Sequence, residues 1–271
     1  MCKPTKSIVT WVTIILLSMT GATTVAYADH AWSTYHWART SNPLALQVVD
    51  SVTEDWQSTF EMSLDMWNRS EVLSMAVTSA DDAKNTRKRC QMVKGQMHVC
   101  NAAYGYNGWL GLATIGIDVN GHIDQGTAKV NDSYATYWTD TVEKNHVMCQ
   151  ETGHVFGLGH TSEDGSSQKT CMDYSNDPDS EWPNAHDYEQ LAQIYFHLDS
   201  YNSYDTGGGD GNGDSGGNGC NAPPGKGCNK NNATVPPMGV RVIRGPHHEI
   251  WVAARADGGL WIHHIRLAPE N

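Results

Sequence analysis

Long apolar runs and basic residues are both scarce in this sequence. The apolar run from Ile8 to Leu17 is too short to cross a bilayer as a helix, and no other stretch qualifies. Lys and Arg number 18 against 30 Asp and Glu, so the formal net charge is −12 at pH 7. This shortage argues against nucleic acids and anionic membranes as partners, because both are bound through basic surfaces.

The first 28 residues have the composition of a secretory signal peptide. Lys3 and Lys6 precede the apolar run, and small residues follow it up to Ala26-Tyr27-Ala28. An Ala-x-Ala ending is typical of signal-peptide cleavage sites, so we expect export and cleavage after Ala28. Loss of the two lysines would bring the net charge to about −14. The sequence therefore predicts a secreted, soluble protein, which we expect to be a monomer.

Residues 146–160, HVMCQETGHVFGLGH, contain the pattern Glu-x-x-His-x-x-Gly-x-x-His. Residues four apart lie on one face of a helix, so Gln150 and His154 can point at a common ion with Glu151 beside them. A straight helix would carry His160 roughly 9 Å further along its axis. The pattern therefore predicts a metal-binding helix followed by a sharp turn.

Gly157 can provide that turn, because glycine adopts the left-handed conformation that ends helices. Gln150 is the unusual residue, since its uncharged amide oxygen is a poorer zinc donor than imidazole. His146 cannot replace it, because it lies roughly 12 Å from His154 along the helix. Three alternatives remain: Gln150 binds zinc through its side-chain oxygen, another residue completes the shell, or no metal is held.

A second pattern, TCMDYS at residues 170–175, follows the first. Together the two resemble the metzincin zinc metalloproteases of the matrixin type, and an exported bacterial group that has Gln in place of the first zinc-ligand histidine. In metzincins a methionine turn lies beneath the metal ligands, and Met172 matches it. Some members carry a tyrosine two residues later that reaches the zinc or stabilises the oxyanion, and Tyr174 matches that residue.

The resemblance implies an α+β fold for residues 29–205, with a twisted mixed sheet, a zinc helix, the methionine turn and a terminal helix. It implies one catalytic Zn²⁺ held by Gln150, His154 and His160. Glu151 would be the general base and Tyr174 would stabilise the oxyanion. A calcium ion is possible as well, but no pattern in the sequence indicates a calcium site. An exposed sheet edge above the site would bind a protein or peptide substrate as an added strand.

Six cysteines remain after Cys2 is removed with the signal peptide, an even number that suits disulfides in an exported protein. Three pairs are expected: Cys90–Cys100, Cys149–Cys171 and Cys220–Cys228. Cys149 and Cys171 would meet if the methionine turn underlies the zinc helix, as the resemblance implies. Free buried thiols are the alternative for these two. No cysteine lies between residues 29 and 60, so latency by a cysteine switch is not expected.

The chain pattern also predicts individual elements. We expect strands over residues 44–52 and 71–78, an amphipathic helix over 54–68, a hairpin over 113–130 turning at Asn120-Gly121, and a helix from Asn184 to about His197.

Residues 206–219 are rich in glycine and predict a flexible linker. Residues 220–271 predict a small disulfide-stapled β tail that turns at residues 257–259. A lone hairpin is marginal in water, so this tail must dock, oligomerise or bind a ligand. We interpret its histidine pairs, residues 247–248 and 263–264, as strand side chains rather than metal ligands.

The sequence thus predicts a secreted zinc-dependent endopeptidase. One alternative is a catalytically weak or inactive pseudo-protease that binds peptides or protein partners. The other is a surface-associated protein that acts through its C-terminal tail.

Overall fold

The computed structural model describes residues 30–204 and 233–269. The predicted signal peptide, the predicted linker and the predicted Cys220–Cys228 pair fall outside these ranges. Among the described residues, no helix combines the length and the apolar composition that crossing a membrane requires.

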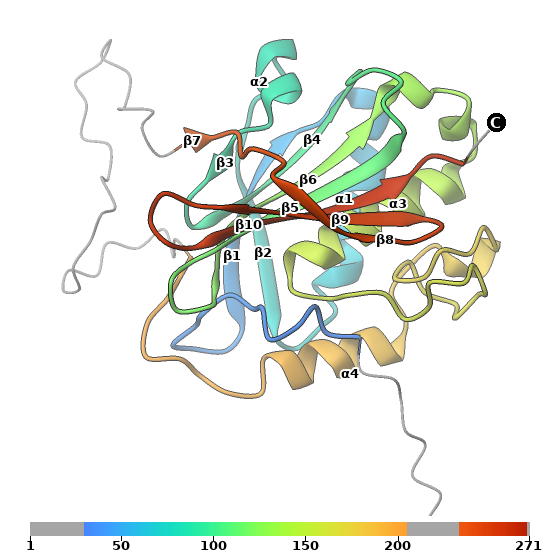
Figure 1. The fold of residues 1–271 in the computed structure, drawn as a ribbon. Coiled ribbons are helices and arrows are strands. Elements are labelled where there is room, and N and C mark those ends of the chain that lie inside the picture. Colours follow the sequence, from blue (N-terminus) through green and yellow to red (C-terminus); the bar gives the residue numbers. More distant parts are fainter. Residues whose placement is uncertain (1–29, 205–232, 270–271) are drawn as a thin grey trace, which may run out of the picture.

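An eight-stranded mixed sheet is the framework of the fold, in the order β2-β1-β4-β6-β5-β10-β9-β8 (Figure 1). Its parallel part consists of β1 (Leu44–Ser51), β2 (Leu73–Ala80), β4 (Gln96–Ala102) and β6 (Ile123–Asn131). The antiparallel part consists of β5 (Trp109–Ile117), β8 (Val240–Arg244), β9 (His248–Ala254) and β10 (Leu260–Leu267). Two short strands, β3 (Met92–Val93) and β7 (Ala233–Thr234), pair separately.

Four α-helices accompany the described strands: α1 (Glu54–Trp67), α2 (Lys84–Arg89), α3 (Thr141–Val155) and α4 (Ala185–Ile194). Helix α1 buries the apolar stripe that the sequence predicted, and α3 packs against α1, β5 and β6. Asn184 caps α4, with its side chain accepting hydrogen bonds from the backbone amides of His186 and Asp187. The expected strands, the amphipathic helix, the hairpin and this cap are confirmed, and α4 ends a few residues before His197.

The C-terminal hairpin of β9 and β10 extends the main sheet. Strand β10 pairs antiparallel with β5 along its whole length, and Figure 1 shows the two strands side by side. Arg255, in the turn between β9 and β10, bonds both oxygens of the buried Asp124 carboxylate on β6 at 2.6 and 3.0 Å. The tail therefore docks onto the N-terminal part of the chain, and β10 occupies the edge of β5.

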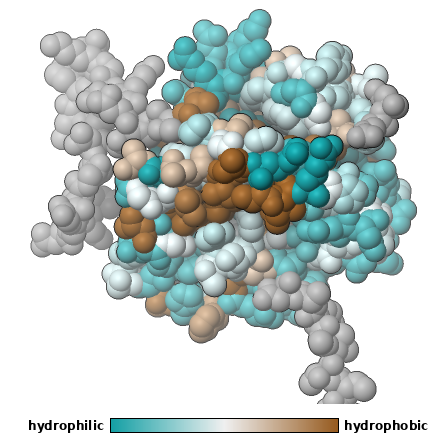
Figure 2. All heavy atoms as spheres, in the orientation of Figure 1, coloured by the Kyte–Doolittle hydropathy of each residue, from teal (hydrophilic) through white to brown (hydrophobic). Residues whose placement is uncertain are grey.

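The far edge of the sheet is β8, whose side chains are all exposed. Figure 2 shows a hydrophobic band across the face where the C-terminal strands lie, and exposed apolar side chains of β8 (Val240, Val242 and Ile243) belong to that surface. Arg241 and Arg244 alternate with them, and charged residues of this kind limit pairing of an open edge with other chains.

Two disulfides are present in the described residues. Cys90 bonds Cys100, and Cys149 bonds Cys171, as the sequence predicted. The second bond joins α3 to the segment that carries Met172. It therefore fixes the helix relative to the loop beneath it.

Candidate metal and catalytic site

The turn after α3 depends on Gly157, as the sequence predicted. Its φ is +94°, and a Cβ at this position would lie 2.0 Å from the backbone oxygen of Tyr35. The amide of Trp32 donates a hydrogen bond to the oxygen of Gly157. Only glycine satisfies both the backbone conformation and this close approach of the N-terminal segment. The chain then turns back and brings His160 towards His154, with 4.7 Å between the ring centroids.

Three histidine rings converge at this point, and one of them comes from the C-terminal strand. The ligand atoms of His154, His160 and His264 all lie within 4.8 Å of one another. The ring of His264 is 3.9 Å from that of His154 and 4.4 Å from that of His160, between centroids. His264 reaches the site because β10 places it opposite Ala113 of β5.

The hydrogen bonds of these rings leave nitrogen atoms free. Nδ1 of His154 donates to the backbone oxygen of Leu158 at 2.7 Å, and its buried Nε2 has no partner among the residues that the structure describes. The same holds for the buried Nδ1 of His264. The hydroxyl of Tyr174 lies 2.8 Å from Nε2 of His160 and 3.4 Å from Nε2 of His264. The cluster thus contains unpaired ring nitrogens in a closed space, which is costly unless a ligand occupies it.

Burial keeps these rings neutral. It lowers the pKa of His154 to about 3. Burial, followed by the neighbouring imidazoles, also lowers the pKa of His160 and of His264 well below the usual range. Neutral imidazole is the form that binds a metal ion, so the three side chains fit the nitrogen-donor set that zinc prefers.

Glu151 lies fully buried on the same helix, three residues before His154. Its carboxylate presses against β5: a Cβ at Gly111 would lie 2.3 Å from its Oε1 atom. Burial raises the pKa of Glu151 well above its usual value, although Arg266 and the backbone of Ala113 act in the opposite direction. Burial therefore favours the neutral carboxylic acid, and a cation bound at the neighbouring imidazoles would favour the carboxylate form.

Gln150 has different partners from those expected of a zinc ligand. Its amide oxygen accepts a hydrogen bond from Nη1 of Arg266 at 2.9 Å, and its amide nitrogen donates to the backbone oxygen of Asp173 at 2.7 Å. A divalent cation at that oxygen would lie next to a guanidinium charge. The side chain therefore fastens α3 to β10 through Arg266.

The expected methionine turn lies beneath the helix. A Cβ at Gly153 would lie 2.6 Å from the sulfur of Met172, so the methionine packs directly against the ligand helix. The backbone oxygen of Met172 accepts a hydrogen bond from the amide of Thr161, just after His160. With the Cys149–Cys171 bond, these contacts fix the floor of the site.

From the sequence, His264 is interpreted as an ordinary strand side chain, and the structure places it in the cluster with His154 and His160. Its partner His263 does have such a role, with Nδ1 3.0 Å from the hydroxyl of Thr114 on β5. Side chains alternate between the two faces of a strand, so only one of two neighbouring histidines can face α3. One feature of the sequence indicated this placement: a lone C-terminal hairpin is marginal in water, so the strand that carries His264 had to pack against another part of the protein.

A cavity of about 910 Å³ opens beside this site and is lined by residues of β5, α3 and the C-terminal strands. Tyr174 and Arg266 form part of its wall. Strand β5 has no free edge here, because it pairs with β6 on one side and with β10 on the other. With β10 paired to β5, a ligand can reach Tyr174 through this cavity.

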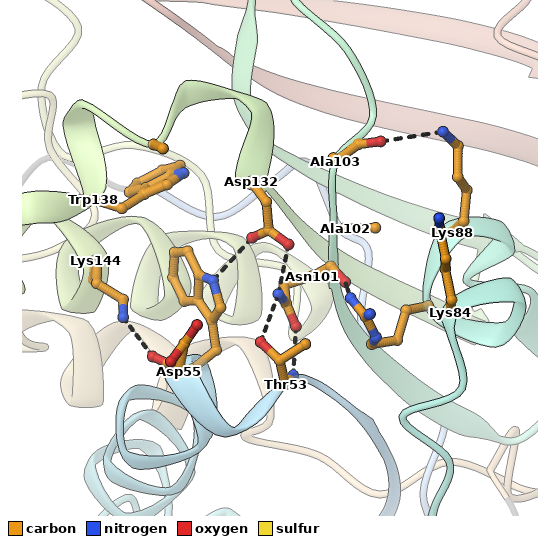
Figure 3. Close-up of a pocket in the computed structure, with 13 residues that line it drawn as sticks. Thr53, Asp55, Lys84, Lys88, Asn101, Ala102, Ala103, Asp132, Trp138 and Lys144 are labelled. Carbon is orange, nitrogen blue, oxygen red and sulfur yellow. Dashed lines mark hydrogen bonds between the residues drawn. The ribbon is translucent and has the colours of Figure 1, made fainter.

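A second cavity, of about 680 Å³, lies near α1 and α2 and is shown in Figure 3. Asp132 accepts hydrogen bonds there from the indole of Trp56 and from Asn101, at 2.9 and 2.7 Å. Lys144 donates to the backbone oxygen of Asp55. These polar groups are partners of one another, so the second cavity offers no comparable set of unpaired atoms.

Comparison with known proteins adds little. No protein-family model matches the sequence, and no curated protein is detectably similar to it. Among solved structures, archaemetzincin from Methanopyrus kandleri matches with a TM-score of 0.34 and 16% identity, over 57% of this chain and 97% of that chain. A similarity of this size does not assign a family, so the functional argument rests on the site itself.

Proposed function

We propose that this protein is a zinc-dependent peptide hydrolase. The observation that carries the proposal is the convergence of three buried, neutral imidazoles, those of His154, His160 and His264, next to the buried carboxylate of Glu151. The substrate class, protein or peptide, is inferred from the resemblance of the helix and methionine-turn motifs to the metzincins. Export through the predicted signal peptide would place the activity outside the cell.

His154, His160 and His264 would hold the ion as a set of three imidazoles, which is a known ligand set of catalytic zinc. Bound zinc would act as a Lewis acid on the scissile carbonyl and would lower the pKa of a water molecule towards neutrality. Gln150 is not in this set. It would position the site by holding Arg266, and through it the strand that carries His264.

The residues around the cluster have distinct roles in this proposal. Glu151 would accept the proton of the attacking water and transfer it to the leaving amine nitrogen. The hydroxyl of Tyr174 would donate a hydrogen bond to the carbonyl oxygen as negative charge develops on it. Burial raises the pKa of Tyr174 well above its usual value, so its hydroxyl keeps the proton that this role needs.

One observation favours a second candidate, a pseudo-protease that binds partners without cleaving them. Glu151 and His154 are fully buried, and β10 covers the edge of β5 that would accept an added strand. In this form the site has no room for an extended peptide along β5. A hydrolase would therefore have to admit its substrate through the adjoining cavity or by a local displacement of β10.

Zinc analysis and peptidase assays of three variants separate these candidates. Glu151→Gln should retain zinc at the three-imidazole cluster and lose cleavage of a casein-type substrate. His264→Ala should lose both the zinc of this cluster and the activity. Gln150→Glu should keep the zinc affinity of the wild type, because it preserves an oxygen acceptor for Arg266.

The outcomes differ clearly. An active wild-type protein that is indifferent to chelators would refute zinc catalysis. A wild-type protein that holds zinc at this cluster without any cleavage would favour the pseudo-protease. A higher zinc affinity in Gln150→Glu, with no loss of zinc in His264→Ala, would restore position 150 as the ligand.

A further inference from the structure

A second group of histidines lies away from the site described above. Nε2 atoms of three histidines surround one oxygen, Oδ1 of Asp199: that of His36 at 3.6 Å, that of His122 at 3.4 Å and that of His197 at 3.4 Å. The ring of His36 lies 4.7 Å from that of His122 and 4.9 Å from that of His197, between centroids. The ligand atoms of His36, His197 and Asp199 all lie within 4.8 Å of one another, and His122 contacts this group through the oxygen of Asp199.

These separations are too long for hydrogen bonds, which join nitrogen and oxygen at about 2.7–3.2 Å. Nε2 of His36 is buried and has no hydrogen-bond partner. The other oxygen of Asp199, Oδ2, accepts a hydrogen bond from the backbone amide of Arg39 at 2.8 Å. Zinc bonds its nitrogen and oxygen ligands at about 2.0–2.2 Å, so neighbouring ligand atoms of a tetrahedral site stand roughly 3.3–3.6 Å apart. The distances from Oδ1 of Asp199 to Nε2 of His36 and of His197, 3.6 and 3.4 Å, match two edges of such a tetrahedron.

In two of these histidines, His36 and His122, the ring nitrogen that faces away from Asp199 has a hydrogen-bond partner. Nδ1 of His36 lies 2.8 Å from the backbone oxygen of Thr34, to which it can only donate. Nδ1 of His122 lies 2.8 Å from the hydroxyl of Tyr201, and that hydroxyl donates to the carboxylate of Asp118 at 2.6 Å. A proton on each Nδ1 leaves Nε2 with its lone pair directed towards Asp199. Metal-bound histidines are oriented by outer contacts of this kind.

We propose that His36, His197 and Asp199 bind a second Zn²⁺ ion, that the ring of His122 turns in as its fourth ligand, and that this ion is structural. Four protein ligands close a tetrahedral site and leave no position for water or substrate. The ligands come from the N-terminal segment, from the turn between β5 and β6, and from the segment after α4. The ion ties these three segments together at the end of the fold that holds Gly157 and the turn to His160.

The proposal does not depend on the function of the first cluster, since the two sites share no residue. The test is the zinc content of the purified full chain after dialysis, measured by elemental analysis, together with its melting temperature before and after chelation. His197→Ala is the informative variant, because this side chain is the most exposed of the four ligands, at 37%, and its loss leaves the core intact. Phe196→Ala is the matched control, because Phe196 is an exposed neighbour that contacts the ring of His197.

We expect two zinc ions in the wild type and in Phe196→Ala, and one in His197→Ala. Affinity at the second site should fall by more than about 100-fold in His197→Ala, since even outer contacts of a metal site are worth 10–100-fold. Zinc should raise the melting temperature of the wild type and of His154→Ala through this site. It should do so much less in His197→Ala.

The two sites can fail independently. One ion that is lost in His154→Ala and kept in His197→Ala would overturn the second site alone. One ion that is lost in His197→Ala and kept in His154→Ala would support the second site and contradict zinc catalysis at the first. A wild type without zinc under zinc-replete conditions would overturn both. The variant His36→Ala repeats the test with a buried ligand.

Discussion

Gly111 on β5 offers a direct test of where the proposed general base lies. In the substitution Gly111→Ala, the new methyl group would stand 2.3 Å from Oε1 of Glu151 and 2.7 Å from its Cγ and Cδ atoms. Ordinary contacts between such atoms begin near 3.4 Å. The carboxylate would therefore have to move by about 1 Å, and its side chain has no space to rotate away because it is fully buried.

The consequence for catalysis follows from geometry. A misplacement of roughly 1 Å in a reacting group lowers the rate by about 100-fold, which corresponds to about 2.7 kcal/mol of barrier height. Overpacking of this kind also lowers the free energy of unfolding by about 1–3 kcal/mol. The metal ligands are not touched by the new methyl group, so zinc binding at the first cluster should survive.

The assay compares kcat with a casein-type peptide, zinc content and melting temperature. Gly116→Ala is the matched control, because it lies on the same strand and its methyl group would meet Gln125, Trp261 and Arg255 instead of Glu151. We expect both variants to be less stable than the wild type and only Gly111→Ala to lose kcat by about 100-fold. Equal activity of the two variants would refute the position or the role assigned to Glu151.

Three further predictions concern stability. Replacing both Cys149 and Cys171 with Ala should lower the free energy of unfolding in denaturant by about 3 kcal/mol, the chain-entropy value for a loop of 22 residues; an unchanged value would mean that the bond does not constrain the unfolded chain. Arg255→Ala should cost about 3 kcal/mol, because it removes the close charge partner of the buried Asp124 carboxylate and leaves it only Gln125 and the more distant Lys94, and a loss below 1 kcal/mol would contradict the docked position of the hairpin. Burial lowers the pKa of Lys129 to about 8 from its ordinary 10.5, so the unfolded chain binds more protons between these values and wild-type stability should rise with pH above 8. Lys129→Met should remove that rise and add up to about 3 kcal/mol at pH 7, and a pH profile unchanged by the substitution would show that Lys129 is not the group that titrates.

The part of the site on α3 and in the turn after it could be predicted, because it depends on residues that are close together in the sequence. Helix periodicity places Glu151 and His154 on one face, and Gly157 supplies the turn that brings His160 back. The Cys149–Cys171 bond was predictable for a related reason, since each cysteine adjoins a residue of a recognisable motif. These features depend on offsets of a few residues, which the sequence displays directly.

The remaining parts depend on distant pairing. His264 enters the site only because β10 pairs with β5 in one register, and a shift of one residue would turn His263 towards α3 instead. The three histidines around Asp199 come from three segments that are far apart in the chain. No periodicity links them, so only the folded structure brings them together.

Gln150 shows why a motif position does not fix a role. The helix places it on the face expected of a ligand, yet Arg266 of β10 takes its amide oxygen. A residue on a remote strand therefore decides between a metal ligand and a positioning residue. That strand could not be placed from the motif.

Anomalous diffraction at the zinc edge, from crystals grown with zinc, tests the central claim most directly. The account predicts a peak about 2.0–2.1 Å from one ring nitrogen of each of His154, His160 and His264, with the amide of Gln150 still bonded to Arg266. A peak bonded to the Gln150 oxygen with His264 turned away, or no peak within this cluster, would contradict it.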